Sequence, residues 1–222
     1  MNDIPALARG CAVLGTGGGG DVRTGSLAAI RAIREYGPVP LLKLDDLPGD
    51  ALILPLSGIG APTVSHEMIH GEDEPKRIAE EAERIFGRPP SAIMSSEIGG
   101  ANGVAPVAWA AQLGVPLLDA DGMGRAFPEV QMVSMYVAGI PADLVIMSDV
   151  AGNVVTIRPV DGLWSERIAR AVLRGGGLAR ADVRLPADRR PGQGRGHRGY
   201  GHPRPGDRPG HRGRGGPAGR PA

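Results

Sequence analysis

The sequence of 222 residues is poor in cysteine, in aromatic side chains and in long apolar runs. Its single cysteine, Cys11, excludes an internal disulfide framework and suits a reducing compartment. No apolar run approaches the roughly 20 residues that a membrane helix needs. The amino terminus lacks the basic and apolar regions of a signal peptide. We therefore expect a cytoplasmic protein with no membrane partner.

The carboxy-terminal segment also lacks the residues from which cores are built. Residues 188–222 contain no Leu, Ile, Val, Met, Phe or Trp, and they hold 9 arginines against 2 acids. Such a segment cannot bury apolar surface, so it is expected to be disordered. Its composition suits GC-rich codons read out of frame, which indicates a frameshift product. The alternative is an RGG-like RNA-binding segment, although such repeats usually interleave Phe or Tyr and only Tyr200 is present.

Without that segment the chain is acidic. Residues 1–187 hold 16 Lys and Arg against 22 Asp and Glu, so the overall charge of +1 is a property of the tail. An acidic body is not typical of a nucleic-acid-binding domain. We expect one glycine-rich α/β domain over residues 1–180, with no nucleic-acid partner, followed by a disordered tail over residues 181–222.

Short apolar runs alternate with helical patterns along the body. This alternation predicts an α/β three-layer sandwich with a mostly parallel sheet covered by helices. The expected strands lie at 39–44, 51–56, 92–95, 115–118, 144–147 and 154–158, the last two joined as a hairpin by DVAGN. The expected helices lie at 3–14, 24–36, 74–86, 104–113 and 164–173.

Three polar clusters each follow an expected strand. They are SGIGAPT, which leads to Thr63, then SSEIGGAN, then DADGMGRAFPE. Ligands of parallel sheets collect outside the carboxyl ends of the strands. The clusters therefore predict one composite polar site.

In EIGGAN, a carboxylate and a carboxamide lie on either side of a Gly-Gly turn. Glu97 and Asn102 together can orient an amide-like ligand. Glu97 would serve as a general base if burial raised its pKa. The alternative is a simple helix entry in which Asn102 caps the 104–113 helix.

DADGMGRAFPE is denser in charge. One of Asp119 and Asp121 is expected to face the site, and Arg125 to pair with it or to bind a substrate carboxylate bidentately. Glu129 follows Pro128 in an extended or turn geometry. Solvated turn acids are the alternative. The acids could also hold a divalent cation, but neither CxxC nor EF-hand spacing is present, so we assign no metal ligands.

The GTGGGGD loop brings backbone N–H groups within reach of a ligand at Gly17, Gly18 and Gly19. It lacks the Lys-Ser/Thr of a P-loop and the GxGxxG phasing, and it follows a helix. The loop therefore does not indicate any particular cofactor. Two interpretations stay open: a loop that holds a small anionic or amide ligand, or a tight link between two packed helices. Separately, His66–His70 fits HExxH formally, but Pro62 and Gly71 confine it to two turns at most, which favours a surface or site-lining helix over a zinc protease.

Taken in order, LGTGGGGD, GAPT, EIGGAN, DADGMGRAFPE and the D..GN hairpin resemble the N-terminal domain of the S-methyl thiohydantoin desulfurase-like family. The family is also labelled hydantoinase/oxoprolinase-like. The resemblance covers about residues 5–178 and implies a three-layer α/β domain, normally followed by a mostly-β domain. It also implies activity on a five-membered cyclic amide related to hydantoin. The departure lies after Gly177, where the Arg/Gly/Pro segment stands in place of the β-rich domain.

The sequence and the resemblance together give a hypothesis about function. We expect a hydrolase-type domain, in a homo-oligomer, that processes a hydantoin-like or S-methyl thiohydantoin-like cyclic amide. Its base would be Glu97 or Asp121, and Arg125 and Asn102 would orient the ring. The alternative is a non-catalytic partner subunit of a hydantoinase/oxoprolinase assembly, and RNA binding by the tail ranks third. The remaining residues expected to contact substrate are Gly17, Gly18, Gly19, Thr63, Asp119 and Glu129.

Overall fold

The computed structural model of the chain describes residues 2–60, 71, 73–176, 179–183 and 185–186. The chain divides into two units, residues 1–189 and 190–222, and every described residue belongs to the first. The expected disordered tail beyond residue 186, Thr63 and the His66–His70 segment lie outside the described residues. Within the described part of the chain, no helix is both long and apolar enough to cross a membrane.

An eight-stranded sheet has the order β1-β4-β3-β2-β7-β5-β6, with β8 also paired to β2. Its first four strands run parallel, which confirms the expected α/β fold. They are β1 (Leu41–Leu42), β4 (Leu117–Asp121), β3 (Ala92–Ser95) and β2 (Leu52–Ile59).

The other half of the sheet is antiparallel. The strand β7 (Ala179–Val183) pairs antiparallel with both β2 and β5 (Val145–Asp149), so β2 and β5 run in the same direction. The strand β6 (Val154–Ile157) returns beside β5 in the hairpin expected from DVAGN.

The sheet includes residues beyond the expected domain boundary at 180. The boundary falls inside β7, and β8 (Leu185–Pro186) follows it. The physical reason is visible in ARADV, where apolar and polar residues alternate with the period of a strand. The expected start of the disordered tail at residue 181 is therefore wrong for residues 181–183 and 185–186.

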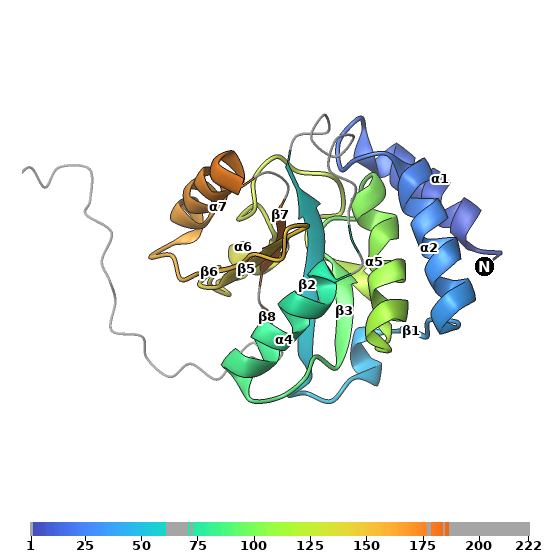
Figure 1. Cartoon of the computed structure of the whole chain (residues 1–222), viewed down its shortest axis with the longest axis horizontal. Coiled ribbons are helices and arrows are strands. Elements are labelled where there is room, and N and C mark those ends of the chain that lie inside the picture. Colours follow the sequence, from blue (N-terminus) through green and yellow to red (C-terminus); the bar gives the residue numbers. More distant parts are fainter. Residues whose placement is uncertain (1, 61–70, 72, 177–178, 184, 187–222) are drawn as a thin grey trace, which may run out of the picture. The chain divides into compact units, whose positions relative to one another are not determined.

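Helices cover both faces of the sheet (Figure 1). On one face lie α4 (Glu74–Phe86) and α5 (Ala101–Leu113), and α1 (Ile4–Gly15) and α2 (Val22–Tyr36) pack on the outer side of α5. On the other face, α7 (Gly162–Gly176) packs on β5 and β6, and the short α6 (Ser134–Val137) contributes Met135 to a cluster with Ile53 and Met94. A 3-10 turn, η1 (Leu44–Asp46), follows β1.

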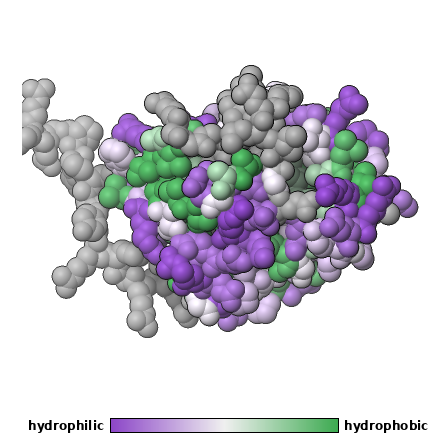
Figure 2. Space-filling view, in the orientation of Figure 1, coloured by the Kyte–Doolittle hydropathy of each residue, from purple (hydrophilic) through white to green (hydrophobic). Residues whose placement is uncertain are grey.

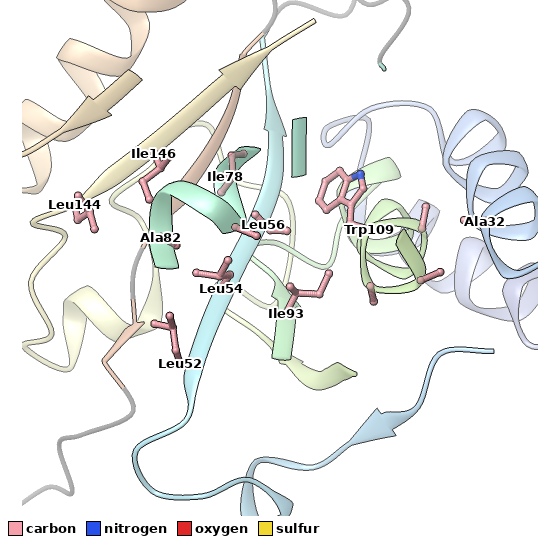
Figure 3. Packing of buried hydrophobic residues seen from close by; sticks show 14 residues of the cluster. Ala32, Leu52, Leu54, Leu56, Ile78, Ala82, Ile93, Trp109, Leu144 and Ile146 are labelled. Atoms are coloured by element: carbon pink, nitrogen blue, oxygen red, sulfur yellow. The ribbon is translucent and has the colours of Figure 1, made fainter. Parts of the chain in front are cut away.

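The period-2 pattern of β2 decides which residues form the main core. Leu52, Leu54 and Leu56 all point toward the α4 and α5 face, where they meet Ile78 of α4 and Trp109 of α5 (Figure 3). The opposite side of α4 is charged, and the hydrophilic area in the middle of Figure 2 lies over this helix. This amphipathic pattern is why residues 74–86 could be predicted as a helix with its observed bounds.

Candidate active site at the carboxyl edge of the sheet

The polar residues that follow β2, β3 and β4 meet at one edge of the sheet. These strands are parallel, so their carboxyl ends lie together. Hydrogen bonds join the three segments: Gly58 near the carboxyl end of β2 bonds to Asn102, and Ile98 after β3 bonds to Asp121 of β4. The expected composite cluster is therefore present in the fold.

Glu97 is at the centre of this cluster and is 8% exposed. Its Oε1 accepts a hydrogen bond from Asn102 Nδ2, and its Oε2 accepts one from the backbone N–H of Phe127 at 2.8 Å. Asn102 also bonds to the backbone of Gly58, with Oδ1 accepting from the N–H at 2.8 Å and Nδ2 donating to the carbonyl at 3.0 Å. Both amide protons of Asn102 are thus engaged, so this side chain fixes Glu97 against the end of β2.

Asn102 does not cap α5. The N-cap position of α5 is Gly100, at φ 65°, and Asn102 lies within the first turn. The conformation of Gly100 favours glycine, because the left-handed region is costly for other residues. The capping alternative for Asn102 is therefore wrong, since its side chain is committed to Gly58 and Glu97.

The environment of Glu97 favours its neutral form. Burial raises the pKa of this carboxyl group, the hydrogen bonds from Phe127 and Asn102 lower it, and the charge of Asp121 raises it again. Burial is the largest of these effects, so the pKa of Glu97 lies above its ordinary value. A carboxyl group of this kind is suited to proton transfer nearer to neutral pH.

Ser95 supports the turn that carries Glu97. This buried hydroxyl lies 2.5 Å from the carbonyl oxygen of Glu97 and 2.9 Å from that of Asn102. The signal in the sequence was its place as the last residue of β3, directly at the start of the polar cluster. Ser95 thus joins the two ends of the EIGGAN turn.

Asp121 holds the turn that follows β4. Its Oδ2 accepts three backbone hydrogen bonds, from Ile98 at 3.1 Å, Met123 at 3.1 Å and Gly124 at 2.6 Å. A carboxylate that organises three N–H groups serves the architecture of the loop. Of the two expected bases, Glu97 therefore has the more suitable position for chemistry.

Asp119 is an exposed residue of β4. Side chains two residues apart on a regular strand share a face. Here, however, the pairing with β3 shifts between Ile93, which faces Leu117, and Ser95, which faces Asp121. Because of this irregularity, Asp121 and not Asp119 is paired with Ser95.

Arg125 and Glu129 lie on the loop beyond β4. The guanidinium of Arg125 is 5.4 Å from the centre of the Phe127 ring, and its Nε donates to the carbonyl of Ala126 at 3.3 Å. Glu129 accepts a hydrogen bond from Gln131 at 2.5 Å. Within the described residues, no hydrogen bond joins Arg125, Asp119 or Glu129 to Glu97, so their contact with substrate stays a prediction.

The glycine-rich loop packs against the same turn. The carbonyl of Gly19 accepts the N–H of Asn102 at 3.0 Å, and that of Gly20 accepts the N–H of Ala101 at 3.1 Å. A Cβ on Gly19 would collide with the backbone of Gly99. The structure therefore shows this loop as a close backbone link between the α1–α2 turn and the start of α5. Ligand contacts by Gly17, Gly18 and Gly19 stay a prediction.

No cluster of three or more His, Cys, Asp or Glu side chains suited to a metal ion occurs among the residues that the structure describes. Cys11, another residue with reactive chemistry, is buried in the helix layer, and burial raises the pKa of its thiol. The thiolate is therefore disfavoured, and Cys11 serves as a small core residue in the cluster around Ile4, Ala29 and Val104.

Comparison with known proteins shows the family of the chain. A family model described as the S-Me-THD-like, N-terminal domain matches residues 2–159. The chain belongs to this family. All the expected site residues lie inside the matched range of the S-Me-THD-like domain, including Glu97, Asn102 and Asp121.

A solved structure has the same fold as this S-Me-THD-like domain. It is an X-ray crystal structure of a protein from Chromobacterium violaceum, with a TM-score of 0.66 and 24% sequence identity. The match covers 84% of this chain and 54% of that one, so the chain spans about half the length of its structural relative. At this identity the likeness concerns the fold alone. No curated protein matches the chain.

Proposed function

We propose that this S-Me-THD-like domain hydrolyses a five-membered cyclic amide related to hydantoin or S-methyl thiohydantoin, with Glu97 as the proton-transferring group. The observation that carries the proposal is the position of Glu97: a buried carboxyl group at the carboxyl edge of a parallel sheet, with two neutral hydrogen-bond donors and a raised pKa. Membership of the S-Me-THD-like family supports the substrate class.

In the proposed reaction, the Glu97 carboxylate takes a proton from a water molecule as the water oxygen attacks a ring carbon. For a hydantoin-like ring the carbon–nitrogen bond breaks, and Glu97 returns the proton to the departing nitrogen. For an S-methyl thiohydantoin-like ring the carbon–sulfur bond breaks, and the proton leaves with methanethiol. Asn102 keeps the carboxylate oriented, and the Nη groups of Arg125 supply donors for a ring oxygen.

The test compares Glu97→Gln with the unchanged chain on a panel of hydantoins and S-methyl thiohydantoins. Ring opening is followed by ultraviolet absorbance and methanethiol by a thiol reagent. We expect turnover to fall by about 100-fold or more, the usual contribution of a positioned acid–base group. Glu81→Gln is the matched control, because Glu81 is a hydrogen-bonded glutamate on α4 with partners of its own. Equal turnover by Glu97→Gln and the unchanged chain would reject the role of Glu97.

A second candidate is a non-catalytic subunit that works with a separate hydantoinase-type chain. The observation that favours it is the family model, which describes an N-terminal domain and not a whole enzyme. Co-expression with a hydantoinase subunit, followed by size-exclusion chromatography and assay, tests it. Turnover that appears only in the co-purified complex supports this candidate, whereas turnover by the isolated chain removes it.

A further inference from the structure

The helix α7 is bonded to the loop beyond β4 through two charged side chains. Glu166, 8% exposed, accepts the backbone N–H of Val130 at 2.9 Å. Arg170 donates to the carbonyl of Pro128 at 2.6 Å and also pairs with Glu166. One helix thus holds both a donor and an acceptor of the same three-residue stretch of main chain.

That stretch directly follows the residue that touches Glu97. Phe127 donates its N–H to Glu97 Oε2, and the next residue is Pro128. Proline fixes its own φ and restricts the residue before it to extended conformations. A fixed Pro128 carbonyl therefore limits how far the N–H of Phe127 can turn away from Glu97.

The amino-terminal half of the loop has anchors of its own. Asp121 accepts the N–H groups of Met123 and Gly124, and the N–H of Ala126 lies 3.3 Å from the carbonyl of Leu14. The anchors on the far side of Phe127 belong to α7. Phe127 therefore lies between two anchored segments, and α7 fixes the one on its carboxy-terminal side.

We propose that Glu166 and Arg170 are positioning residues, which hold the Phe127 N–H on the Glu97 carboxylate from the opposite face of the sheet. This inference rests on the proposed function, because it assigns to α7 the orientation of the group that transfers the proton. Neither residue touches Glu97, so they act through the main chain of residues 127–130.

The sign of the effect follows from the surroundings of Glu97. Its neighbours are the neutral amide of Asn102 on α5, the N–H of Phe127 and the charged Asp121 on β4. The bond from Phe127 lowers the pKa of Glu97 and so opposes burial. If Arg170 or Glu166 is removed, the bond loosens and the carboxylate loses one of two donors. The pKa of Glu97 then rises further.

The experiment titrates the chain labelled with ¹³C at glutamate carboxyl carbons, with NMR detection. The Glu97 resonance is identified by its absence in Glu97→Gln. We expect an upward shift of the Glu97 midpoint in Arg170→Ala and in Glu166→Ala, and a smaller one in Glu166→Gln, which keeps an acceptor for Val130. Arg167→Ala is the matched control on the same helix, because Arg167 lies over the Trp164 ring, with its guanidinium 5.3 Å from the ring centre.

An unchanged Glu97 midpoint in folded Arg170→Ala overturns the inference, and so does an equal shift in Arg167→Ala. Arg170 is partly exposed, so this variant remains informative if Glu166→Ala does not fold. The titration needs no substrate. Failure of the proposed function, shown by normal turnover in Glu97→Gln, is therefore distinguishable from failure of the positioning role.

Discussion

Two glutamates in different regions of the molecule show what decides the charge state of a carboxyl group here. Glu81 on α4 accepts hydrogen bonds from Arg84 and Thr156, and these lower its pKa to about 2. Glu97 at the sheet edge also accepts hydrogen bonds from two residues, yet its pKa is raised. The donors to Glu97 are neutral and the site is buried, whereas Glu81 has a guanidinium partner near solvent. The charge of the donor and the access of water therefore affect the pKa of these glutamates more than the number of hydrogen-bonding residues does.

The largest effect should come from breaking the backbone packing on which only the Glu97 region depends. In Gly19→Ala the new Cβ would collide with the backbone of Gly99, at a residue with φ +76°. We expect the free energy of unfolding to fall by at least about 3 kcal/mol, because the collision involves backbone that cannot move aside. Urea unfolding measures this loss. The carboxyl titration of Glu81 should be unchanged wherever the variant remains folded.

Gly17→Ala is the matched control in the same loop. Gly17 also has a positive φ, of 92°, but a Cβ there would meet nothing within 4 Å. The cost should therefore be about 1–2 kcal/mol, from backbone conformation alone. Equal losses at Gly17 and Gly19 would mean that the close approach to Gly99 does not matter for stability.

The sequence predicted the members of the Glu97 region because they follow strands that share a direction. Glu97 and Asn102 come after β3, and Asp121 ends β4, so the rule for parallel sheets was enough to bring them together. It could not supply their partners. Asn102 bonds to the main chain of Gly58, 44 residues away, and Glu97 bonds to the N–H of Phe127. Every residue has a backbone, so such partners leave no mark in the sequence.

The strand β7 shows a second reason why part of the fold could not be predicted from the sequence. Its alternation of Ala179, Ala181 and Val183 with polar residues has the period of a strand. Alanine adds little apolar area, and the stretch adjoins glycine-rich and arginine-rich residues. The composition of these flanking residues therefore favoured a disordered tail over the strand that the alternation indicates. The bonds from Glu166 and Arg170 to the loop were likewise hidden, because they require α7 to pack beside residues about 40 positions earlier.

A second, smaller effect concerns pH: the contributions of Glu81 and Glu97 to the free energy of unfolding should depend on pH in opposite directions. The pKa of Glu81 is lowered in the folded state, so its contribution is present above the unfolded value and is lost as pH falls toward about 2. We expect Glu81→Gln to cost about 1 kcal/mol at neutral pH, a value reduced for the exposure of Arg84, and progressively less on acidification. Urea unfolding at a series of pH values measures the difference.

Glu97→Gln should show the reverse trend. The folded pKa of Glu97 is raised, so the favourable contribution of its neutral form is full below the unfolded pKa and is lost as pH rises through the folded pKa. The stability of Glu97→Gln relative to the unchanged chain should therefore improve with rising pH. Parallel pH profiles for the Glu81 and Glu97 variants would contradict the contrast between the two regions.

The smallest effect should come from removing the cation that distinguishes the two glutamates. In Arg84→Gln, Glu81 keeps Thr156 as a donor and loses the guanidinium, which is the main cause of its lowered pKa. The pKa of Glu81 should rise toward its ordinary value, and the free energy of unfolding should fall only slightly, because Arg84 is mostly exposed. Lys76→Gln, in the exposed pair with Glu80 at 4.0 Å, is the control and should change neither quantity. If Glu81 still titrated near 2 in Arg84→Gln, the hydroxyl of Thr156 would be sufficient, and the charge of the donor would no longer explain why Glu81 and Glu97 differ.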